Sequence, residues 1–514
     1  MNRLTPSPSV RDLLKSGQED LFDLSGRSRR IAGILSPLTV EDVVRIVRWA
    51  NETHGVRLHA VSCGKNWGFG SALPTEQDAY IVDLSGLKNI RNLDLSAGFA
   101  ELEPGVTQGM LDKALEAGHR THYFNVTGAG TETSVLGNAL ERGIGYFGSR
   151  HEDLLDLEVV LPTGEIIHTS CHSGMPFHTG LGIDLKDLFV QSSLGIVTSA
   201  KVRLPRRPEV MGVLLAKPLP SIPVGKLVEA LATCQAEGLI RSVPHIANKQ
   251  RAYITFAPYL RPEERSAFTA TLSDWSAVIP LFGPKPLVEA ATESIIDRLK
   301  NIASCQFLAS EGAPADGALK PLTDLAQGIP SNVALPGVSF AALGQVEPIG
   351  LNLEKGMAGL IHVVPTCLPE EVSVRSLLNL IEETRLGKKS EPLALTINLV
   401  NVGMAVVVIS VPLIRTREED KLQSVDLADT LLLNCHERGF TPYRLGLNDA
   451  ETLAALSRRP TEKDELLQRM VELFDPNGIL CRSRYQRVDE PVDDTVETPH
   501  LSADLRPETE MVAV

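Results

Sequence analysis

The residues VSCGKNWGFGSALP (61–74) follow directly on a short apolar run. They bring together Gly64, Gly68 and Gly70 with the positively charged Lys65. Glycine adopts backbone conformations that other residues avoid, and it lets a ligand approach the main chain closely. Successive N–H groups in such a loop can hold an anion. Alone, the pattern fits a structural turn as well as a binding loop, and its spacing is neither GxGxxG nor that of a P-loop.

The segment before this loop predicts a helix. In SPLTVEDVVRIVRWANETHG (36–55), Thr39 can cap the helix and Asp42 completes a capping-box-like pair. Apolar residues recur at positions 43, 46, 47 and 50, which gives one apolar stripe. Gly55 ends the pattern.

Short apolar runs and turn residues on both sides of the loop predict strands. The runs lie at 57–62, 79–84 and 99–105, and a further helix is expected over 110–117. The stretch LEVVLPTGEIIHT (157–169) predicts a hairpin that turns at Thr163-Gly164. This alternation predicts an α+β domain that extends to about residue 206.

After residue 210 the sequence predicts longer helices and more apolar strands. The run 393–414 is long, but Asn398, Asn401 and Gly403 interrupt it, so we expect buried strands there and not a membrane span. A helix is expected over 424–438, and another that closes on Asp-Pro-Asn-Gly at 475–478. From about residue 487 an acidic segment rich in Pro and Thr predicts a disordered tail.

Composition narrows the class of protein. The 514 residues carry a net charge of −14, which argues against nucleic acid or an anionic membrane as partner. There is no apolar run of ~18 residues and no signal-like N-terminus, so we expect a cytoplasmic protein. The seven cysteines are scattered without a CxxC pair, so we expect free thiols and neither disulfides nor a metal site.

Four further motifs occur in order along the chain: LEPGVT (102–107), TGAGTETSVLGNALERGIGYFGSRHEDLLDLEVVLPTGE (127–165), FVQSSLGIVTSAKVRL (189–204) and DPNGIL (475–480). With the opening loop, they make the chain resemble the vanillyl-alcohol oxidase/p-cresol methylhydroxylase family of FAD-linked oxidoreductases. The resemblance covers about 25–206 and the last sixty or so residues before the tail, and is loose between them. It implies a PCMH-type FAD-binding domain made from both ends of the chain, with an α+β cap inserted. The expected segments are 1–206, 207–429 (cap), 430–486 and the tail 487–514.

The resemblance also implies which residues contact FAD. The opening loop would wrap the pyrophosphate, and later segments would line the flavin and the adenosine. The expected residues are Ser62, Gly64, Lys65, Asn66, Trp67, Gly68, Phe69, Pro104, Gly105, Thr127, Gly128, Thr133, Ser134, Val135, Gly137, Asn138, Gly145, Gly195, Ile196, Val197 and Arg484.

Many members of the family bond FAD covalently, and this sequence lacks the side chains they use. A histidine of the pyrophosphate loop is replaced by Lys65. The cap-strand histidine or tyrosine falls near Gly403, Met404 and Ala405. We therefore expect noncovalent FAD.

Tyr443 and Arg444 match the tyrosine-arginine pair with which phenol-oxidising members hold a phenolate. The second tyrosine of that site is Phe69 here, and the family's aspartate is missing from the region of Ser149, Arg150 and His151. These departures disfavour para-hydroxybenzyl substrates. His151 is a candidate base, because the free pKa of histidine lies near neutrality, or it is a histidine that is hydrogen-bonded at a loop-to-helix junction.

Several roles stay open from the sequence. Arg150 is either a surface arginine or a phosphate ligand, and Arg444 serves the flavin carbonyl, the substrate or both. Arg484 either places a cation near flavin N1 or is exposed. An aromatic cluster, His122, Tyr123 and Phe124, either lines the substrate cavity or belongs to the core. From the cap, His362 is a candidate to line the substrate pocket.

We expect a flavoprotein that transfers hydride from a small organic substrate, an alcohol, phenol-like compound or amine, to flavin N5. The reduced flavin would be reoxidised by dioxygen if the protein is an oxidase, or by an electron-acceptor protein if it is a dehydrogenase. A non-catalytic flavin-binding homologue is the third alternative. A homodimer is common in the family, and a role in secondary metabolism is suggested.

Overall fold

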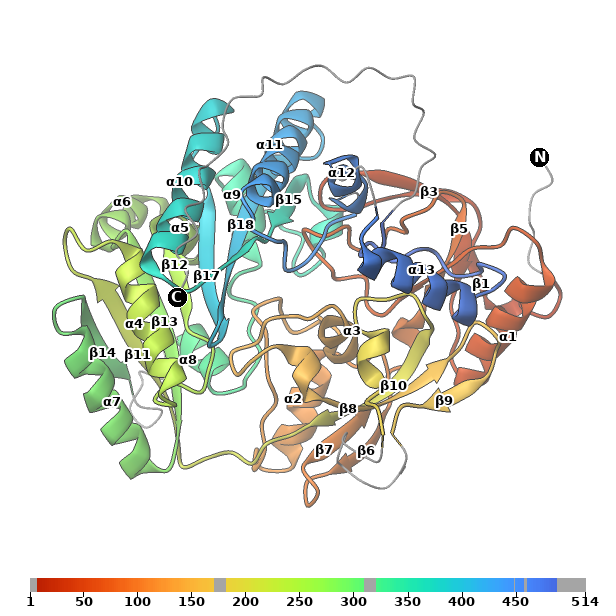
Figure 1. Ribbon diagram of the computed structural model, residues 1–514, viewed down its shortest axis with the longest axis horizontal. Coiled ribbons are helices and arrows are strands. Elements are labelled where there is room, and N and C mark those ends of the chain that lie inside the picture. Colours follow the sequence, from red (N-terminus) through yellow and green to blue (C-terminus); the bar gives the residue numbers. More distant parts are fainter. Residues whose placement is uncertain (1–6, 171–181, 309–319, 448, 457–459, 488–514) are drawn as a thin grey trace, which may run out of the picture.

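The computed structural model describes residues 7–170, 182–308, 320–447, 449–456 and 460–487. Cys171 and nearly all of the expected tail lie outside these ranges. The protein is α+β, as the sequence predicts, with two small sheets on one side and one large sheet on the other (Figure 1).

The first small sheet contains the opening loop between two of its strands. Its order is β1-β3-β5-β4, with β2 paired to β3, and β3, β5 and β4 run parallel. Its strands are β1 (Leu14–Ser16), β2 (Glu19–Phe22), β3 (Ser28–Leu35), β4 (Leu58–Val61) and β5 (Ala79–Asp83). The glycine loop therefore leaves the end of β4 and returns to β5.

Helix α1 (Val40–Glu52) packs on this sheet and begins as the sequence predicts. The Thr39 hydroxyl accepts from the backbone N–H of Asp42, and the Asp42 carboxylate accepts from the N–H of Thr39. Val43, Ile46, Val47 and Ala50 are all buried. The capping box and the apolar stripe fix both the start of the helix and the face it buries.

The second small sheet is antiparallel, in the order β6-β7-β10-β8-β9. The predicted hairpin is present as β8 and β9, with Gly164 at φ 84° in its turn. The strands are β6 (Ile90–Asp94), β7 (Phe99–Leu102), β8 (Leu154–Val160), β9 (Ile166–His168) and β10 (Ile196–Arg203). Helices α2 (Gln108–Ala117) and α3 (Val135–Leu140) pack with it in one core.

The C-terminal part of the chain returns to the N-terminal sheet. The N–H of Leu58 on β4 donates to Ile479 O at 2.7 Å, and the N–H of Cys481 donates to Leu58 O at 2.9 Å. Helix α13 (Glu462–Phe474) lies on the same side of the molecule as the first sheet (Figure 1). Asp475 ends this helix and accepts from the N–H groups of Ile479 and Leu480, as a turn at Asp-Pro-Asn-Gly requires.

The cap is built on an eight-stranded sheet in the order β14-β11-β13-β12-β17-β18-β15, with β16 paired to β18. The expected apolar run forms strands β17 and β18, which turn at Val402-Gly403. The strands are β11 (Val210–Pro218), β12 (His245–Asn248), β13 (Trp275–Gly283), β14 (Ala303–Leu308), β15 (Ala358–Val363), β16 (Thr366–Cys367), β17 (Ala394–Asn401) and β18 (Met404–Ile414). No helix in the described ranges is long and apolar enough to cross a membrane.

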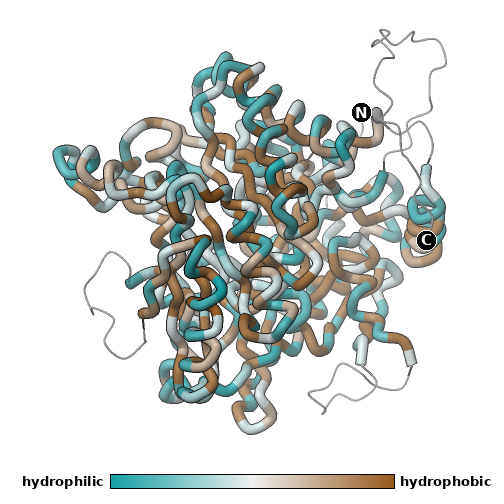
Figure 2. Tube along the Cα trace, turned by 60° about the vertical axis from the view of Figure 1, so that its left-hand side comes forward, coloured by the Kyte–Doolittle hydropathy of each residue, from teal (hydrophilic) through white to brown (hydrophobic). Residues whose placement is uncertain are grey.

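Helices cover both faces of the cap sheet. One face forms the largest apolar core with α4 (Val224–Ala236), α7 (Lys285–Leu299), α10 (Glu371–Gly387) and α11 (Glu418–Glu437). The other face turns toward the two small sheets and also meets α5 (Lys249–Phe256), α8 (Lys320–Ala326) and α9 (Pro336–Leu343). The remaining helices are α6 (Pro262–Thr271) and α12 (Asp449–Leu456). Apolar segments run through the interior of both halves (Figure 2).

Helix α11 differs from the sequence prediction, because it begins at Glu418 and not at Ser424. Its first turn carries Glu418, Glu419 and Asp420, and acidic residues stabilise a helix N-terminus without adding apolar periodicity. The helix also spans the predicted boundary at 429/430. The domain bounds stay predictions, although β10 ends at Arg203 and β11 begins at Val210.

Candidate active site

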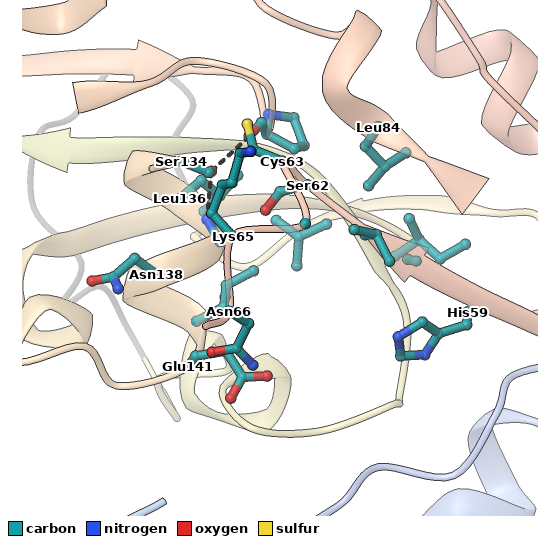
Figure 3. A pocket seen from close by; sticks show the side chains of 18 of the residues that line it. His59, Ser62, Cys63, Lys65, Asn66, Leu84, Ser134, Leu136, Asn138 and Glu141 are labelled. Atoms are coloured by element: carbon teal, nitrogen blue, oxygen red, sulfur yellow. Dashed lines mark hydrogen bonds between the residues drawn. The ribbon is translucent and has the colours of Figure 1, made fainter. Parts of the chain in front are cut away.

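A cavity of about 1080 Å³, partly open to solvent, lies where the two small sheets meet the C-terminal segment (Figure 3). We call it the main cavity. Residues from six separate segments line it. Those predicted from the sequence are Ser62, Gly64, Lys65, Asn66, Pro104, Thr133, Ser134, Gly137, Asn138, Gly195, Ile196, Val197 and Arg484.

The other predicted cofactor residues do not line the main cavity. Gly105, Thr127, Gly128, Val135 and Gly145 are not among the residues that line the cavity, and neither are Trp67, Gly68 and Phe69. Thr127 donates its backbone N–H to the buried side chain of Gln108, and Val135 belongs to the core. The structure therefore places these residues in supporting positions, whereas Phe69 takes part in a separate cluster described below.

The glycine loop has the backbone that its composition predicts. Gly64, Gly68 and Gly70 have φ angles of 67°, 78° and 104°, in the region that other residues rarely adopt. At Gly68 a Cβ atom would lie 2.3 Å from Cδ2 of His362 in the cap. The backbone N–H of His362 donates to Gly68 O at 2.9 Å. The loop therefore packs main chain to main chain against β15.

Lys65 is held by the cap. Its Nζ lies 3.4 Å from Glu354 Oε2, and the same carboxylate accepts from Trp67 Nε1 at 2.6 Å. Lys65 Nζ also lies over the Trp67 ring, 5.6 Å from its centre. The ammonium group thus lines the main cavity while its charge is partly balanced by the cap.

The opposite wall is formed by α3 and the residue before it. Ser134 caps the helix by accepting from the N–H of Gly137 at 2.9 Å, and its hydroxyl donates to Pro104 O at 2.6 Å. A Cβ on Gly137 would lie only 2.1 Å from Ser62 Oγ. A side chain at position 137 would therefore close the space between the glycine loop and this helix.

Two polar side chains in the wall have no partner. Ser71 Oγ and Gln191 Nε2 are buried and accept or donate no hydrogen bond among the described residues. Both residues line the main cavity, and both have positive φ angles, 48° and 54°. Because a buried polar atom without a partner is costly, these atoms indicate a polar ligand in the cavity.

At the floor of the main cavity a carboxylate lies between two arginines. Glu141 Oε2 accepts from the Tyr485 hydroxyl at 2.6 Å and lies 3.6 Å from Arg444 Nη2. Burial acts to raise the pKa of Glu141, but Arg484 and Arg444 outweigh it and hold that pKa below its usual value. Arg484 also donates to the carbonyl of Phe69, which ties the C-terminal segment to the glycine loop.

Arg444 links Glu141 at the floor of the main cavity to Asn66 and Phe69 of the glycine loop. Its Nη2 donates to Asn66 Oδ1 at 2.6 Å, and its guanidinium carbon lies 4.2 Å from the centre of the Phe69 ring. Arg444 Nε is buried without a partner among the described residues. The arginine is thus fixed in place and retains an unused donor.

Tyr443 begins a chain of three hydroxyl and imidazole groups. Its hydroxyl lies 3.0 Å from Ser149 Oγ, which in turn lies 2.7 Å from Nδ1 of His151. Burial raises the pKa of Tyr443 and lowers the pKa of His151 below its ordinary value. At neutral pH the phenol is therefore protonated and the imidazole is neutral.

The wall beside Tyr443 is apolar. Phe69, Val364, Val400 and Val406 form a buried cluster, and Tyr443 packs against it together with Ile144, Met404 and Val408. The Phe69 ring also lies 5.3 Å from the His362 ring. Aliphatic residues of β17 and β18 thus surround the one tyrosine of the expected pair that the chain retains.

Comparison with known proteins agrees with this geometry. Residues 31–170 match the family model described as FAD binding domain. The chain is 24% identical to the 1'-carboxy-chondrochloren decarboxylase of Chondromyces crocatus over 89% of its own length and 91% of that protein. It is 25% identical to the flavoprotein subunit of 4-cresol dehydrogenase [hydroxylating] of Pseudomonas putida, over 57% of this chain and 60% of that one. The structure of p-cresol methylhydroxylase with substrate bound superposes with a TM-score of 0.77 at 22% identity, covering 89% of each chain.

The chain is thus an FAD-binding oxidoreductase that resembles the p-cresol methylhydroxylase-type proteins in sequence and in fold. FAD is its cofactor, and the fold comprises an FAD-binding domain and a cap. The main cavity fits that group. Its unpartnered Ser71 and Gln191 atoms call for a polar ligand, and Gly137 lets α3 approach Ser62 of the glycine loop more closely than any side chain would allow.

Several alternatives left by the sequence can now be placed in this FAD-linked oxidoreductase. Arg484 is buried and lines the main cavity, and Arg150 is also buried, with Nη1 donating to Asn138 at 3.0 Å. A surface position is therefore wrong for both. His122, Tyr123 and Phe124 are buried away from the main cavity, and Tyr123 packs on Phe147 at 4.8 Å, as in the core alternative.

Sequence reasoning missed several residues of the cavity. His59 and Cys63 line it beside the glycine loop, as do Glu141 and Gln191. Glu141 stands four residues after Gly137, and that spacing on one helical face was the signal available. Gln191 gave no such signal, because its unpartnered amide is visible only in the folded chain.

Proposed function

We propose that this protein oxidises a small organic substrate at a C–H bond beside an OH group, an amine or an activated ring. When bound, FAD supplies the hydride acceptor, flavin N5, and dioxygen then takes the electrons. The observation that carries the proposal is that Tyr443 packs on the apolar cap cluster while Arg444 contacts Asn66 and Glu141, two residues that line the main cavity.

Arg444 is the group that would stabilise negative charge on the substrate or cofactor. Asn66, Glu141 and Phe69 fix the position of its guanidinium. A fixed charge of this kind stabilises a transition state without reorganising. Its free Nε is the donor that remains for a bound group.

The hydrogen-bonded chain from Tyr443 to His151 would remove the proton of the substrate's OH or NH group. The Tyr443 oxygen takes the substrate's proton as its own proton passes to Ser149 Oγ, and Ser149 passes its proton to Nδ1 of His151. His151 can accept because burial keeps its imidazole neutral. In this proposal Tyr443 is the group that touches substrate, and Ser149 and His151 act through it.

The substrate pocket favours compounds other than simple para-hydroxybenzyl alcohols. Phe69 offers no hydroxyl for a phenolate, and Val400, Val406 and Met404 make the wall aliphatic. Similarity over most of its length to a protein named as a decarboxylase adds a second candidate, in which oxidation is coupled to loss of CO₂. Carbon dioxide release is therefore measured with every active compound.

We further propose that FAD is held without a covalent bond. Gly403 and Met404 at the cap turn offer no histidine or tyrosine, and Lys65 stands in the glycine loop. Of the side chains that line the main cavity, His59 and Cys63 are the candidates for a bond. Acid precipitation tests this: we expect the yellow colour in the supernatant, and a yellow pellet with a flavin-labelled peptide would contradict it.

The experiment that tests the function is an anaerobic screen of alcohols, phenols, amines and hydroxy acids against the FAD-loaded protein. Bleaching of the flavin by one class supports the proposal, and readmitted oxygen separates the alternatives. Hydrogen peroxide in step with substrate indicates an oxidase, whereas turnover only with an artificial dye indicates a dehydrogenase with a protein partner. A flavin that chemical reductants bleach but no compound does would favour the non-catalytic homologue.

A further inference from the structure

A second cavity, of about 1290 Å³ and partly open to solvent, lies within the cap. We call it the cap cavity. Helices α5 and α9, the first residues of β17, the end of β18 and helix α11 surround it. It shares no lining residue with the main cavity, so FAD does not fill it.

The inner end of the cap cavity carries one positive charge, Arg251. Its Nη2 donates to Ser410 Oγ and, at 3.4 Å, to Ala394 O. Nε is buried without a hydrogen bond, and no carboxylate of the described residues pairs with the guanidinium. Burial lowers the pKa of Arg251 to about 10, so the group is still charged at neutral pH.

Arg251 is half-buried, and an arginine in that position without a carboxylate partner is unusual, because an uncompensated charge is costly in an apolar setting. The other charged residues that line the cap cavity do not neutralise the positive charge of Arg251. Lys388, Lys389 and Glu391 are exposed, and the carboxylate of Asp420 accepts from the N–H of Ile414. The half-buried guanidinium therefore has no anionic partner among the described residues.

The rest of the cap cavity is suited to a hydrocarbon chain. Seven branched aliphatic side chains line it: Ile254, Val338, Leu360, Leu393, Val411, Leu413 and Leu427. Ala334, Ala341 and Ala342 keep one wall open. A small anion alone would leave this apolar space empty, and a chain without a charge would leave Arg251 unpaired.

We infer that the cap cavity binds an aliphatic carboxylate, with its head group on Arg251 and its chain along the aliphatic wall. The planar fork of the guanidinium suits a carboxylate, and Nε offers a donor with no other use. The inference goes beyond the proposed function, since it names a second ligand site and requires no turnover.

The site is connected to the flavin side by direct contacts. Ser410 Oγ, which accepts from Arg251, lies 3.1 Å from Nδ1 of His362, and the His362 ring packs on Phe69. Ser410 follows Val406 by four residues on β18, which is about 13 Å along a strand. A ligand bound to Arg251 would thus affect Phe69 through Ser410 and His362 without entering the main cavity.

The test is calorimetric titration of the FAD-loaded full chain with octanoate, octanamide and acetate. We expect saturable octanoate binding, with octanamide at least about tenfold weaker because it lacks the charge. Acetate keeps the charge but loses the chain, so we expect far weaker binding. Failure of octanoate to bind, or equal binding of acetate, overturns the inference.

Arg251→Gln should weaken octanoate on the order of tenfold to a hundredfold and leave octanamide within about twofold. Arg375→Gln is the matched control, because Arg375 is an exposed cap arginine outside the cavity, paired with Glu371. A variant that keeps full octanoate affinity without Arg251 contradicts the inference.

A second variant serves if Arg251→Gln does not fold. Ala341→Phe fills the cap cavity and leaves Arg251 in place, so it should abolish octanoate binding while FAD stays bound. Unchanged octanoate affinity in folded Ala341→Phe overturns the assignment of the cavity. Because none of these readouts uses catalysis, a failed substrate screen would leave them intact.

Discussion

The main cavity and the cap cavity are built by different means. Glycines, backbone turns and a helix cap shape the main cavity, and its charged groups meet at the floor. Side chains from three helices and three strands of the cap form the other cavity, around a single arginine. The cofactor side is thus specified by local backbone geometry, and the cap side by which side chains share a sheet face.

This difference explains why the cofactor-binding half could be predicted from the sequence and the cap cavity could not. A loop that needs positive φ at 64, 68 and 70 must place glycines there, and they stand together in the chain. Arg251, His362 and Ser410 meet only because β18 pairs with β15 and α5 packs over them. No short sequence motif encodes a contact between residues this far apart in the chain.

The largest expected effect comes from the contact between the two halves. Arg444→Ala should lower the rate of flavin reduction about 10²–10³-fold, because a fixed charge at the reacting group is lost. FAD should stay bound, since the glycine loop and α3 remain. Stopped-flow absorbance measures the rate, with exposed Arg438→Ala as control, and an unchanged rate would remove Arg444 from the active site.

The backbone half is tested at Gly105. A Cβ there would lie 2.4 Å from Ser85 O and 2.6 Å from Leu87 O, and both are main-chain atoms that cannot rotate away. Gly105→Ala should therefore lower the free energy of unfolding by about 1–3 kcal/mol. Urea unfolding measures it against Gly387→Ala, where nothing lies within 4 Å. Equal urea midpoints for the two variants would contradict this prediction, because they would show that the backbone around Gly105 has room for a Cβ atom.

The proton path should contribute a smaller factor. Ser149→Ala breaks the link between Tyr443 and His151 and should slow turnover about tenfold, at the low end of acid–base effects because a water can bridge the gap. Ser149→Thr keeps a hydroxyl and should restore most of the rate.

The path also sets a pH dependence. Burial lowers the pKa of His151 below the ordinary 6.5, so its neutral, proton-accepting form persists from alkaline pH down past 6.5. Activity should therefore hold to 6.5 and fall only as the pH drops through the lowered pKa. His151→Gln should abolish this acid limb, and a limb that survives in that variant would assign the titration to another group.

The smallest effect is expected at the cap-facing aromatic residue. Phe69→Tyr adds the hydroxyl that phenol-oxidising relatives use, so it should tighten binding of para-substituted phenols by up to about tenfold. Difference spectra of the oxidised flavin measure the affinity. Benzyl alcohol, without the phenol group, is the control and should bind as before. A weaker phenol complex would show that the wall around Val406 does not admit the ring in this orientation.

Sequence reasoning reached different depths in different parts. The capping box at Thr39 and Asp42, the hairpin at Gly164 and the Asp475 turn were predicted correctly, because each rests on neighbouring residues. The α11 start was missed, since its acidic first turn lacks apolar periodicity. The unpartnered atoms of Ser71 and Gln191 and the charge of Arg251 depend on burial by distant segments, which no local pattern encodes.

The central claim is that both ends of the chain close one cavity around FAD, and titration of apoprotein with FAD tests it most directly. We predict uptake of one FAD per chain by the wild type and loss of that uptake in Gly137→Val, whose side chain would enter the space beside Ser62. A folded wild-type protein that takes up no FAD, or a Gly137→Val variant that binds it as tightly, would contradict the account.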